Sequence, residues 1–90
     1  MKTLLGKGII IMTIGIDDLR NSLNIGSDIE FKFNGIAYSI IPSTPKGILF
    51  GRQYSDDEQY FSSSDAFIDN CKIEGKQIKD IIGEIEILLM

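Results

Sequence analysis

The clearest pattern of hydrophobic and polar positions surrounds the pair Asn34-Gly35. On both sides of this pair, apolar residues alternate with polar or small ones: Ile29, Phe31 and Phe33 before it, and Ile36, Tyr38 and Ile40 after it. An Asn-Gly pair between two alternating runs favours a two-residue type I′ turn, because both turn positions need a positive φ. The expected pairs are Phe33 with Ile36, Phe31 with Tyr38, and Ile29 with Ile40. The sequence therefore predicts a hairpin with one apolar face and one polar face.

Three other segments space their apolar residues as amphipathic helices do. Their stripes are Ile16, Leu19 and Leu23; Phe67 and Cys71; and Ile78, Ile81, Ile82 and Ile85. Gly26 follows the first stripe as a stop signal. A serine run, Ser62 to Ser64, precedes the second stripe, and serine is a preferred N-cap residue. We therefore expect one N-terminal helix and two short C-terminal helices.

Two further strands are predicted between the hairpin and the second helix. Pro42 and Pro45 cannot donate hydrogen bonds to a sheet, so residues 42–47 are interpreted as a loop. Residues 48–54 alternate again and predict a third strand, and residues 59–61 form a short fourth strand after a polar turn. Residues 84–90 are ambiguous, because they extend the last helical stripe and also alternate as a strand would.

These elements predict an α+β fold in which helices pack on the apolar face of a sheet. The sheet is antiparallel and has three to four strands, with the N-terminal helix and the two short C-terminal helices on one face. The predicted core contains Leu19, Leu23, Ile29, Phe31, Phe33, Tyr38, Ile40, Phe50, Phe67, Ile78, Ile81 and Ile82.

The first eleven residues have two interpretations. Gly6-Lys7-Gly8 can be encoded as a purine-rich ribosome-binding site, in which case translation starts at Met12 and residues 1–11 are a mis-assigned extension. In the other interpretation, Ile9 to Ile14 form a genuine N-terminal strand. The apolar run lacks the cleavage site of a signal peptide, and it is shorter than the roughly 20 residues of a membrane span. We expect a single domain over residues 12–90, a cytoplasmic location and no membrane partner.

Composition excludes several classes of function. The 90 residues carry a net charge of −4, and 43% of them are apolar, as is usual for one folded domain. There is no histidine, and the single cysteine, Cys71, is expected to be buried as a small hydrophobe. The glycines match no phosphate-binding loop, and Asp56-Asp57-Glu58 lacks the ligand spacing of a calcium loop. We therefore expect no enzyme, catalytic residue, metal site or cofactor, and no direct nucleic acid binding by so acidic a chain.

Five acidic residues and a single basic one, Arg52, lie between Gly51 and Asn70. One interpretation is a negative surface that engages a basic groove on a partner, with nearby aromatic side chains as anchors. Residues of an extended run are about 3.3 Å apart, close to the roughly 3.4 Å between phosphates of one DNA strand, so such a surface can imitate nucleic acid. The other interpretation is that these charges only keep the domain soluble. The candidate partner-binding residues are Asp56, Asp57, Glu58, Tyr60, Asp65 and Asp69.

The chain has eighteen isoleucines, two alanines and no valine, a bias that indicates the AT-rich codons of a low-GC bacterium or its phage. The order of elements, the acidic charge and the stretch Phe33-Asn34-Gly35-Ile36-Ala37-Tyr38-Ser39-Ile40 resemble small acidic accessory proteins of Gram-positive phages and prophages. Among these, the chain is loosely similar to type II-A anti-CRISPR inhibitors, which occupy the DNA-binding groove of the CRISPR nuclease. The resemblance covers about residues 16–85 in outline.

The resemblance implies a non-enzymatic binding protein of phage or mobile-element type. Its acidic surface would act as a DNA mimic and inhibit a host nucleic-acid-binding protein that has a basic groove. The alternative is a structural or assembly protein that self-associates into a homo-oligomer. The apolar tail, residues 87–90, motivates this alternative because exposed apolar segments favour association.

Overall fold

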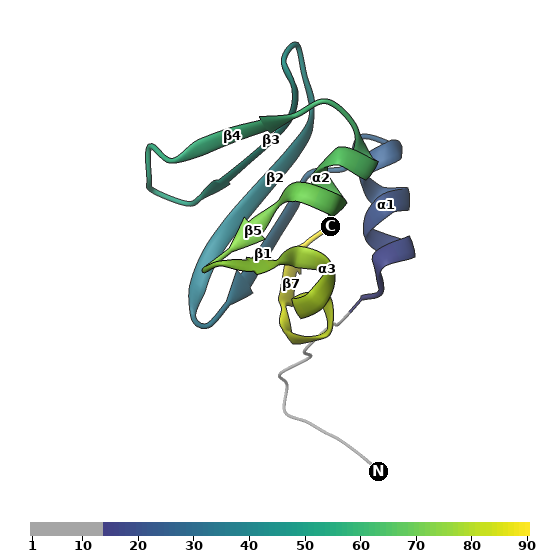
Figure 1. The fold of residues 1–90 in the computed structure, drawn as a ribbon. Coiled ribbons are helices and arrows are strands. Elements are labelled where there is room, and N and C mark those ends of the chain that lie inside the picture. The colour runs from purple at the N-terminus through teal and green to yellow at the C-terminus, as the bar shows by residue number, and fades with distance from the viewer. Residues whose placement is uncertain (1–13) are drawn as a thin grey trace.

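The computed structural model describes residues 14–90 and has an α+β fold (Figure 1). Its larger elements are α1 (Ile16–Asn24), β1 (Ile29–Phe33), β2 (Ile36–Thr44), β3 (Gly47–Arg52), β4 (Glu58–Phe61) and α2 (Ser64–Asn70). The shorter ones are β5 (Lys72–Ile73), β6 (Lys76–Gln77), α3 (Ile78–Ile81), the 3₁₀ turn η1 (Ile82–Glu84) and β7 (Glu86–Leu89). The two interpretations of the N-terminal segment concern residues that lie outside this description.

Within residues 14–90, five strands form one antiparallel sheet in the order β4-β3-β2-β1-β7, and β5 pairs with β6 in a separate small sheet. The prediction of three to four strands was therefore too low. The additional strand is β7, which pairs with the outer edge of β1 through Phe31 and Ile87. This pairing satisfies backbone groups of β1 that would otherwise form an open edge.

The predicted hairpin is confirmed in full. Its register joins Phe33 to Ile36, Phe31 to Tyr38 and Ile29 to Ile40. The two turn residues have φ angles of 52° at Asn34 and 77° at Gly35, as a type I′ turn requires.

The predicted loop over residues 42–47 is wrong for its first half. Strand β2 continues through Pro42 to Thr44, with a register shift between Ile41 and Thr44. Proline has no N–H to donate, and such an irregularity accommodates it within a strand. The Thr44 hydroxyl then closes a tighter turn, because it donates to the Gly47 carbonyl at 2.6 Å and accepts from the Lys46 amide at 3.2 Å.

Residues 84–90, which the sequence left open between a helix and a strand, contain the strand β7. The last helical stripe supplies only one α-helical turn, α3, and continues as η1 before the chain becomes extended at Ile85. The second predicted helix is present as α2, and the Ser63 hydroxyl caps it by accepting from the Ala66 amide at 3.1 Å. Helix α2 lies next to both α1 and α3 (Figure 1).

The side chains that the helices bury join the inner residues of the sheet in one cluster. The predicted core is confirmed except for Ile82, which is only partly buried. Aromatic rings form its centre: Phe31 stacks on Tyr38 and on Phe50, and Phe50 meets the edge of Phe67 with ring centroids 5.8 Å apart. The core members that were not predicted are Ile48, Ile68, Ile73 and Ile85. Side chains on the opposite face of β1, β2 and β3 are not part of this cluster, and we call that side the open face.

Candidate functional site

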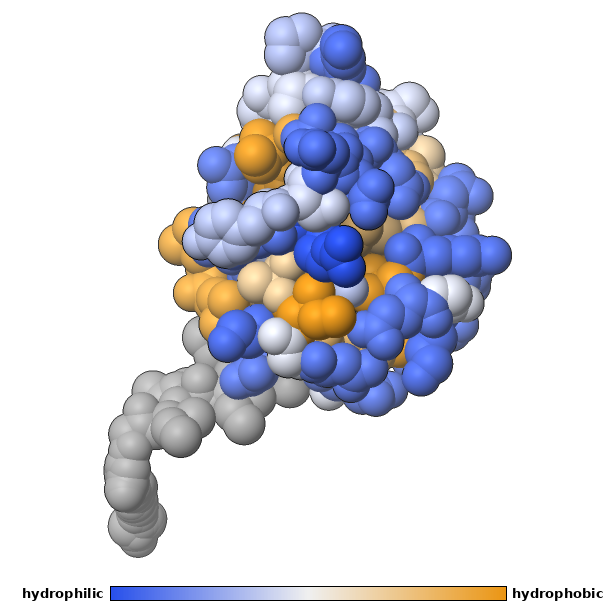
Figure 2. Space-filling view, turned by 90° about the vertical axis from the view of Figure 1, so that its left-hand side faces the viewer, coloured by the Kyte–Doolittle hydropathy of each residue, from blue (hydrophilic) through white to orange (hydrophobic). Residues whose placement is uncertain are grey.

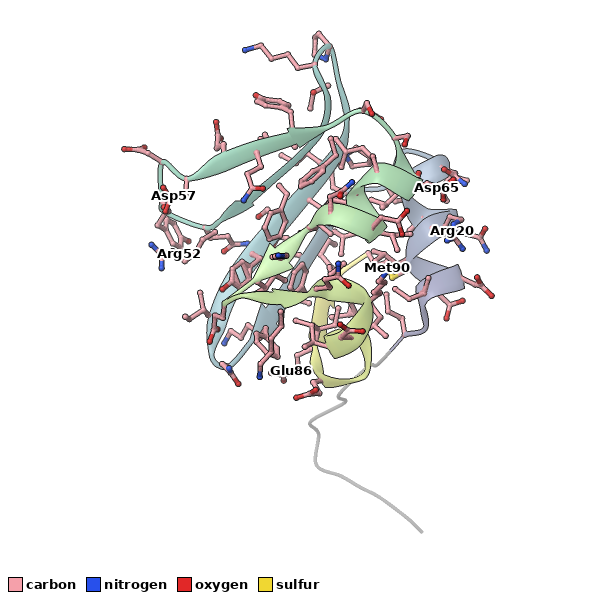
Figure 3. The ribbon with its side chains drawn as sticks, viewed as in Figure 1. Arg20, Arg52, Asp57, Asp65, Glu86 and Met90 are labelled. Carbon is pink, nitrogen blue, oxygen red and sulfur yellow. The ribbon has the colours of Figure 1, made fainter. Side chains whose placement is uncertain are left out.

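The structure divides the six predicted partner-binding residues into two groups. The turn between β3 and β4 carries Asp56 and Asp57, and Glu58 and Tyr60 follow on β4. The remaining two residues, Asp65 and Asp69, belong to α2. Figure 3 shows the separation, because Asp57 lies beside Arg52 at one side of the molecule and Asp65 lies beside Arg20 at the other.

The two carboxylates of α2 have basic neighbours within the domain. Arg20 of α1 contacts Asp65 at 3.1 Å through Nε and Asp17 at 3.1 Å through Nη1. Lys79 of α3 lies 3.8 Å from an oxygen of Asp69. Exposed ion pairs of this kind stabilise a fold only modestly, but they neutralise the charges that a partner would meet. The α2 carboxylates are therefore poorer anchors for a basic partner than their number suggests.

The turn between β3 and β4 presents its charges differently. We call Asp56, Asp57 and Glu58 the acidic corner. Arg52 approaches Asp57 at 3.9 Å, whereas Asp56 and Glu58 take part in none of the ion pairs found within residues 14–90. The hydroxyl of Ser55 accepts from the Asp57 amide at 3.1 Å, which fixes the turn. All three corner residues are exposed, so their charges are available to a partner.

Gly51 allows this turn to fold back onto β3. A Cβ atom at Gly51 would lie 2.9 Å from the Asp57 carbonyl oxygen, closer than real Cβ contacts allow. The missing side chain therefore brings the start of β4 against β3 and makes Glu58 the register partner of Gly51. Because of this register, Glu58 lies at the junction of the acidic corner and the open face.

The open face is organised in rows that run across the strands. Register partners connect Glu30 of β1 to Ser39 of β2, Ser39 to Gly51 of β3, and Gly51 to Glu58 of β4. We call these four residues the acidic row, because a glutamate stands at each end of it. The two residues between the glutamates, Ser39 and Gly51, are small. The neighbouring row contains Ile41, Leu49 and Tyr60, which are also register partners, and we call it the apolar row.

The acidic row and two members of the apolar row, Ile41 and Leu49, line an open hollow of about 450 Å³. Ser39 and Gly51 leave its middle low, Ile41 and Leu49 contribute apolar surface, and residues of the β3–β4 turn contribute to its lining. Ile41 is 37% exposed, although it belongs to a strand in the interior of the sheet. Figure 2, which faces the β3–β4 end of the molecule, shows hydrophobic residues exposed between polar ones.

The charge of this hollow comes mainly from its two glutamates. Arg52 also belongs to its lining, but strand alternation directs the Arg52 side chain to the opposite face, where Tyr38 is its register partner. The Tyr38 hydroxyl has a raised pKa, caused first by burial and then by the charge of Glu74, and nearby Arg52 lowers it in part. Neither Glu30 nor Glu58 is in an ion pair within the described part of the chain.

Among residues 14–90, no three acidic or cysteine side chains are gathered closely enough to hold a metal ion. Burial raises the pKa of Cys71 to about 12, which keeps its thiol protonated and unreactive at neutral pH. No helix in the described part of the chain combines the length and the apolar character needed to cross a membrane.

Of the residues that line the hollow, the sequence predicted only Glu58 as a binding residue. The sequence did contain one signal for the acidic row, because the predicted hairpin register places Glu30 beside Ser39 on the polar face. The position of β3 against β2 was not accessible, since it depends on the register shift between Ile41 and Thr44. The rows could therefore not be assembled from the alternation pattern alone.

Comparison with known proteins adds no functional assignment to this geometry. No protein-family model matches the chain, and no curated protein or solved structure is significantly similar to it.

Proposed function

We propose that this protein is a small, acidic, non-enzymatic binding protein whose acidic corner engages a basic surface on a partner protein. The observation that carries the proposal is the pair Asp56 and Glu58, exposed acidic residues without an ion-pair partner in residues 14–90. Tyr60, 43% exposed on the same strand as Glu58, supplies an aromatic anchor. Tyrosine is enriched among the residues that contribute most to binding, and complementary charges raise the rate and the specificity of association.

The proposed partner is a host nucleic-acid-binding protein with a basic groove. A net charge of −4 favours association with such a groove, where the acidic corner would replace the phosphates of a nucleic acid. The isoleucine-rich, valine-free composition and the resemblance of the hairpin region to acidic phage accessory proteins support a phage or mobile-element origin. Binding would then inhibit the host protein by occupying its groove, and both partners would meet in the cytoplasm.

Affinity capture from a low-GC bacterial lysate tests this proposal. The bait is the full chain, and captured proteins are identified by mass spectrometry at low and at high salt. A nucleic-acid-binding protein that is retained at low salt and released at high salt is the expected result, because screening weakens exposed charge pairs.

Two charge-reversed baits make the test specific to the acidic corner. The variant D56K/D57K/E58K should lose the captured protein. The control D28K/D80K/E84K changes the charge equally, at exposed acidic residues that take part in none of the ion pairs found in residues 14–90, and should retain it. Equal capture by both variants would refute the proposal.

Self-association is a second candidate function, and one observation favours it. Within residues 14–90, strand β7 is an edge of the sheet, and its last residues Leu88 and Leu89 and the following Met90 are 50%, 51% and 41% exposed. An open edge with exposed apolar side chains can pair with a second copy. Deleting the tail would also remove Ile87 from its pairing with Phe31, so the substitution L88S/L89S is the better test. If the protein is an oligomer in analytical ultracentrifugation, this variant should be monomeric, and a monomeric wild-type protein refutes the candidate.

A further inference from the structure

We infer that the hollow on the open face binds an extended segment of a partner protein in which a basic residue lies two positions from a large apolar residue. The inference rests on the proposed function, because it specifies which chemistry the partner presents next to the acidic corner. The arrangement that carries it is the acidic row lying parallel to the apolar row.

The basic residue would lie over Gly51, beside Ser39. These are the middle members of the acidic row, and they leave room above the sheet because one side chain is absent and the other is short. Gln53 borders this space, because its Nε2 donates to the Ser39 hydroxyl at 3.1 Å. Glu30 and Glu58 end the row on the two sides, three strand spacings apart, which is about 14 Å between their Cα atoms. A lysine or arginine side chain in the middle can therefore be reached by both carboxylates, and each contact is a charge-assisted hydrogen bond.

The apolar residue of the partner would lie on Ile41 and Leu49. Ile41 is 37% exposed and Leu49 is half-buried, so residues 14–90 leave this surface partly uncovered. Tyr60 extends the apolar row onto β4, and its ring is covered in part by Lys46, whose Nζ lies 5.3 Å from the ring centroid. A basic partner residue is repelled from that end of the row by Lys46, which favours the acidic row for the positive charge.

The spacing of the rows determines the spacing of the partner residues. Neighbouring rows are two residues apart along each strand, which is about 6.6 Å. An extended peptide repeats its side chains on one face at the same interval, so a segment lying along the strands meets both rows at once. A basic residue, any residue and then an apolar residue, in either direction, is the shortest segment that fits.

Three synthetic peptides test the inference by NMR titration of the full ¹⁵N-labelled chain. The first is a capped Ser-Arg-Ser-Leu-Ser-Arg-Ser peptide, the second replaces its leucine by serine, and the third replaces both arginines by glutamate. We expect the first peptide to shift the amides of Ser39, Ile41, Leu49 and Gly51 together. The second should bind about tenfold more weakly, because it buries no apolar side chain, and the third should not bind.

Substitution of Glu30 separates the hollow from the acidic corner. Glu30 lies on β1 and is not part of the corner, so Glu30→Gln should weaken the first peptide about fivefold through the loss of one charged hydrogen bond. The matched control Glu84→Gln changes the same residue type outside the hollow and should leave binding unchanged.

The possible failures of the inference differ from those of the proposed function. Equal binding of the first two peptides, with shifts confined to residues 54–58, overturns the inference and leaves the acidic corner as the binding site. Unchanged binding by Glu30→Gln also overturns it. Shifts on the open face that grow with protein concentration before any peptide is added would show that a second copy occupies the hollow, and this outcome overturns it as well.

Discussion

Phe31 and Tyr38 are cross-strand partners at the centre of the hairpin, and their rings stack with centroids 5.4 Å apart. Phe31 is completely buried and also stacks on Phe50. Phe31 is also the register partner of Ile87, so this residue takes part in the pairing of β1 with both β2 and β7 and in the packing of the aromatic centre.

Replacing this residue should test how much of the fold depends on that centre. Phe31→Ala should lower the free energy of unfolding by about 3–5 kcal/mol, and Phe31→Leu by about 1–2 kcal/mol, because both leave a cavity in a close-packed core. Chemical denaturation monitored by circular dichroism measures both changes. Ile25→Ala is the control, since Ile25 is 78% exposed and its loss should cost less than about 0.5 kcal/mol. A loss of stability at Phe31 no larger than that of the control would contradict this packing.

Gly47 should be intolerant of any side chain. Its φ is +109°, and an added Cβ would lie 2.5 Å from the Phe61 carbonyl oxygen of the neighbouring strand. We expect Gly47→Ala to destabilise the domain by about 2 kcal/mol or more, because strain and a backbone clash add. At Gly83 nothing lies within 4 Å of an added Cβ, so Gly83→Ala should change stability by less than about 0.5 kcal/mol. Thermal unfolding of the two variants measures this difference. Equal melting temperatures would refute the prediction.

The N-cap of α2 gives a smaller and more local prediction. The Ser63 hydroxyl accepts from the Ala66 amide at 3.1 Å, and its removal leaves that amide without its cap. Ser63→Ala should cost about 1 kcal/mol. Ser62→Ala removes a neighbouring exposed serine that does not cap the helix and should be nearly neutral. Equal urea midpoints for the two variants would show that the cap contributes nothing.

The buried thiol of Cys71 should make the free energy of unfolding depend on pH in the alkaline range. Burial raises the pKa of its thiol from 9.0 to about 12, so the unfolded state ionises at a lower pH than the folded state. The unfolded state then binds fewer protons, and the contribution of this group is complete below pH 9 and is lost as the pH rises to about 12. The free energy of unfolding should therefore fall less steeply over this range in Cys71→Ala than in the wild type. Parallel slopes in the two proteins would contradict the prediction.

The same burial predicts slow modification of the native thiol. At pH 8 the Cys71 thiol should react with a disulfide reagent much more slowly in the folded protein than in urea, because the reactive thiolate is scarce and covered. A native rate equal to that in urea would show that the thiol is accessible.

The sequence was most informative where the signal is local. The hairpin follows from Asn34-Gly35 and from alternation within a few residues, and both the turn and the register are as predicted. The cap of α2 is likewise a local signal, because a serine can satisfy a helix amide wherever it precedes a helix. Such elements can be predicted without knowing which distant residues contact them.

The errors concern elements that are decided by distant partners. The alternation of residues 84–90 fits a strand, but only the unpaired edge of β1 selects that state over a longer helix. Pro42 indicates a loop locally, yet the neighbouring strand β3 keeps this part of β2 extended beyond it. The same limit applies to the candidate site, since Glu30 and Glu58 are joined only through two intervening strands.

The place of β7 in the sheet has a consequence for synthesis of the chain on the ribosome. Strand β1 ends at residue 33, whereas the strand that covers its outer edge begins at residue 86. At a translation rate of about 5–20 residues per second, the intervening residues take on the order of several seconds to appear. During that interval the nascent hairpin exposes the backbone edge that β7 later covers, so the growing chain is most prone to intermolecular pairing before its last strand emerges.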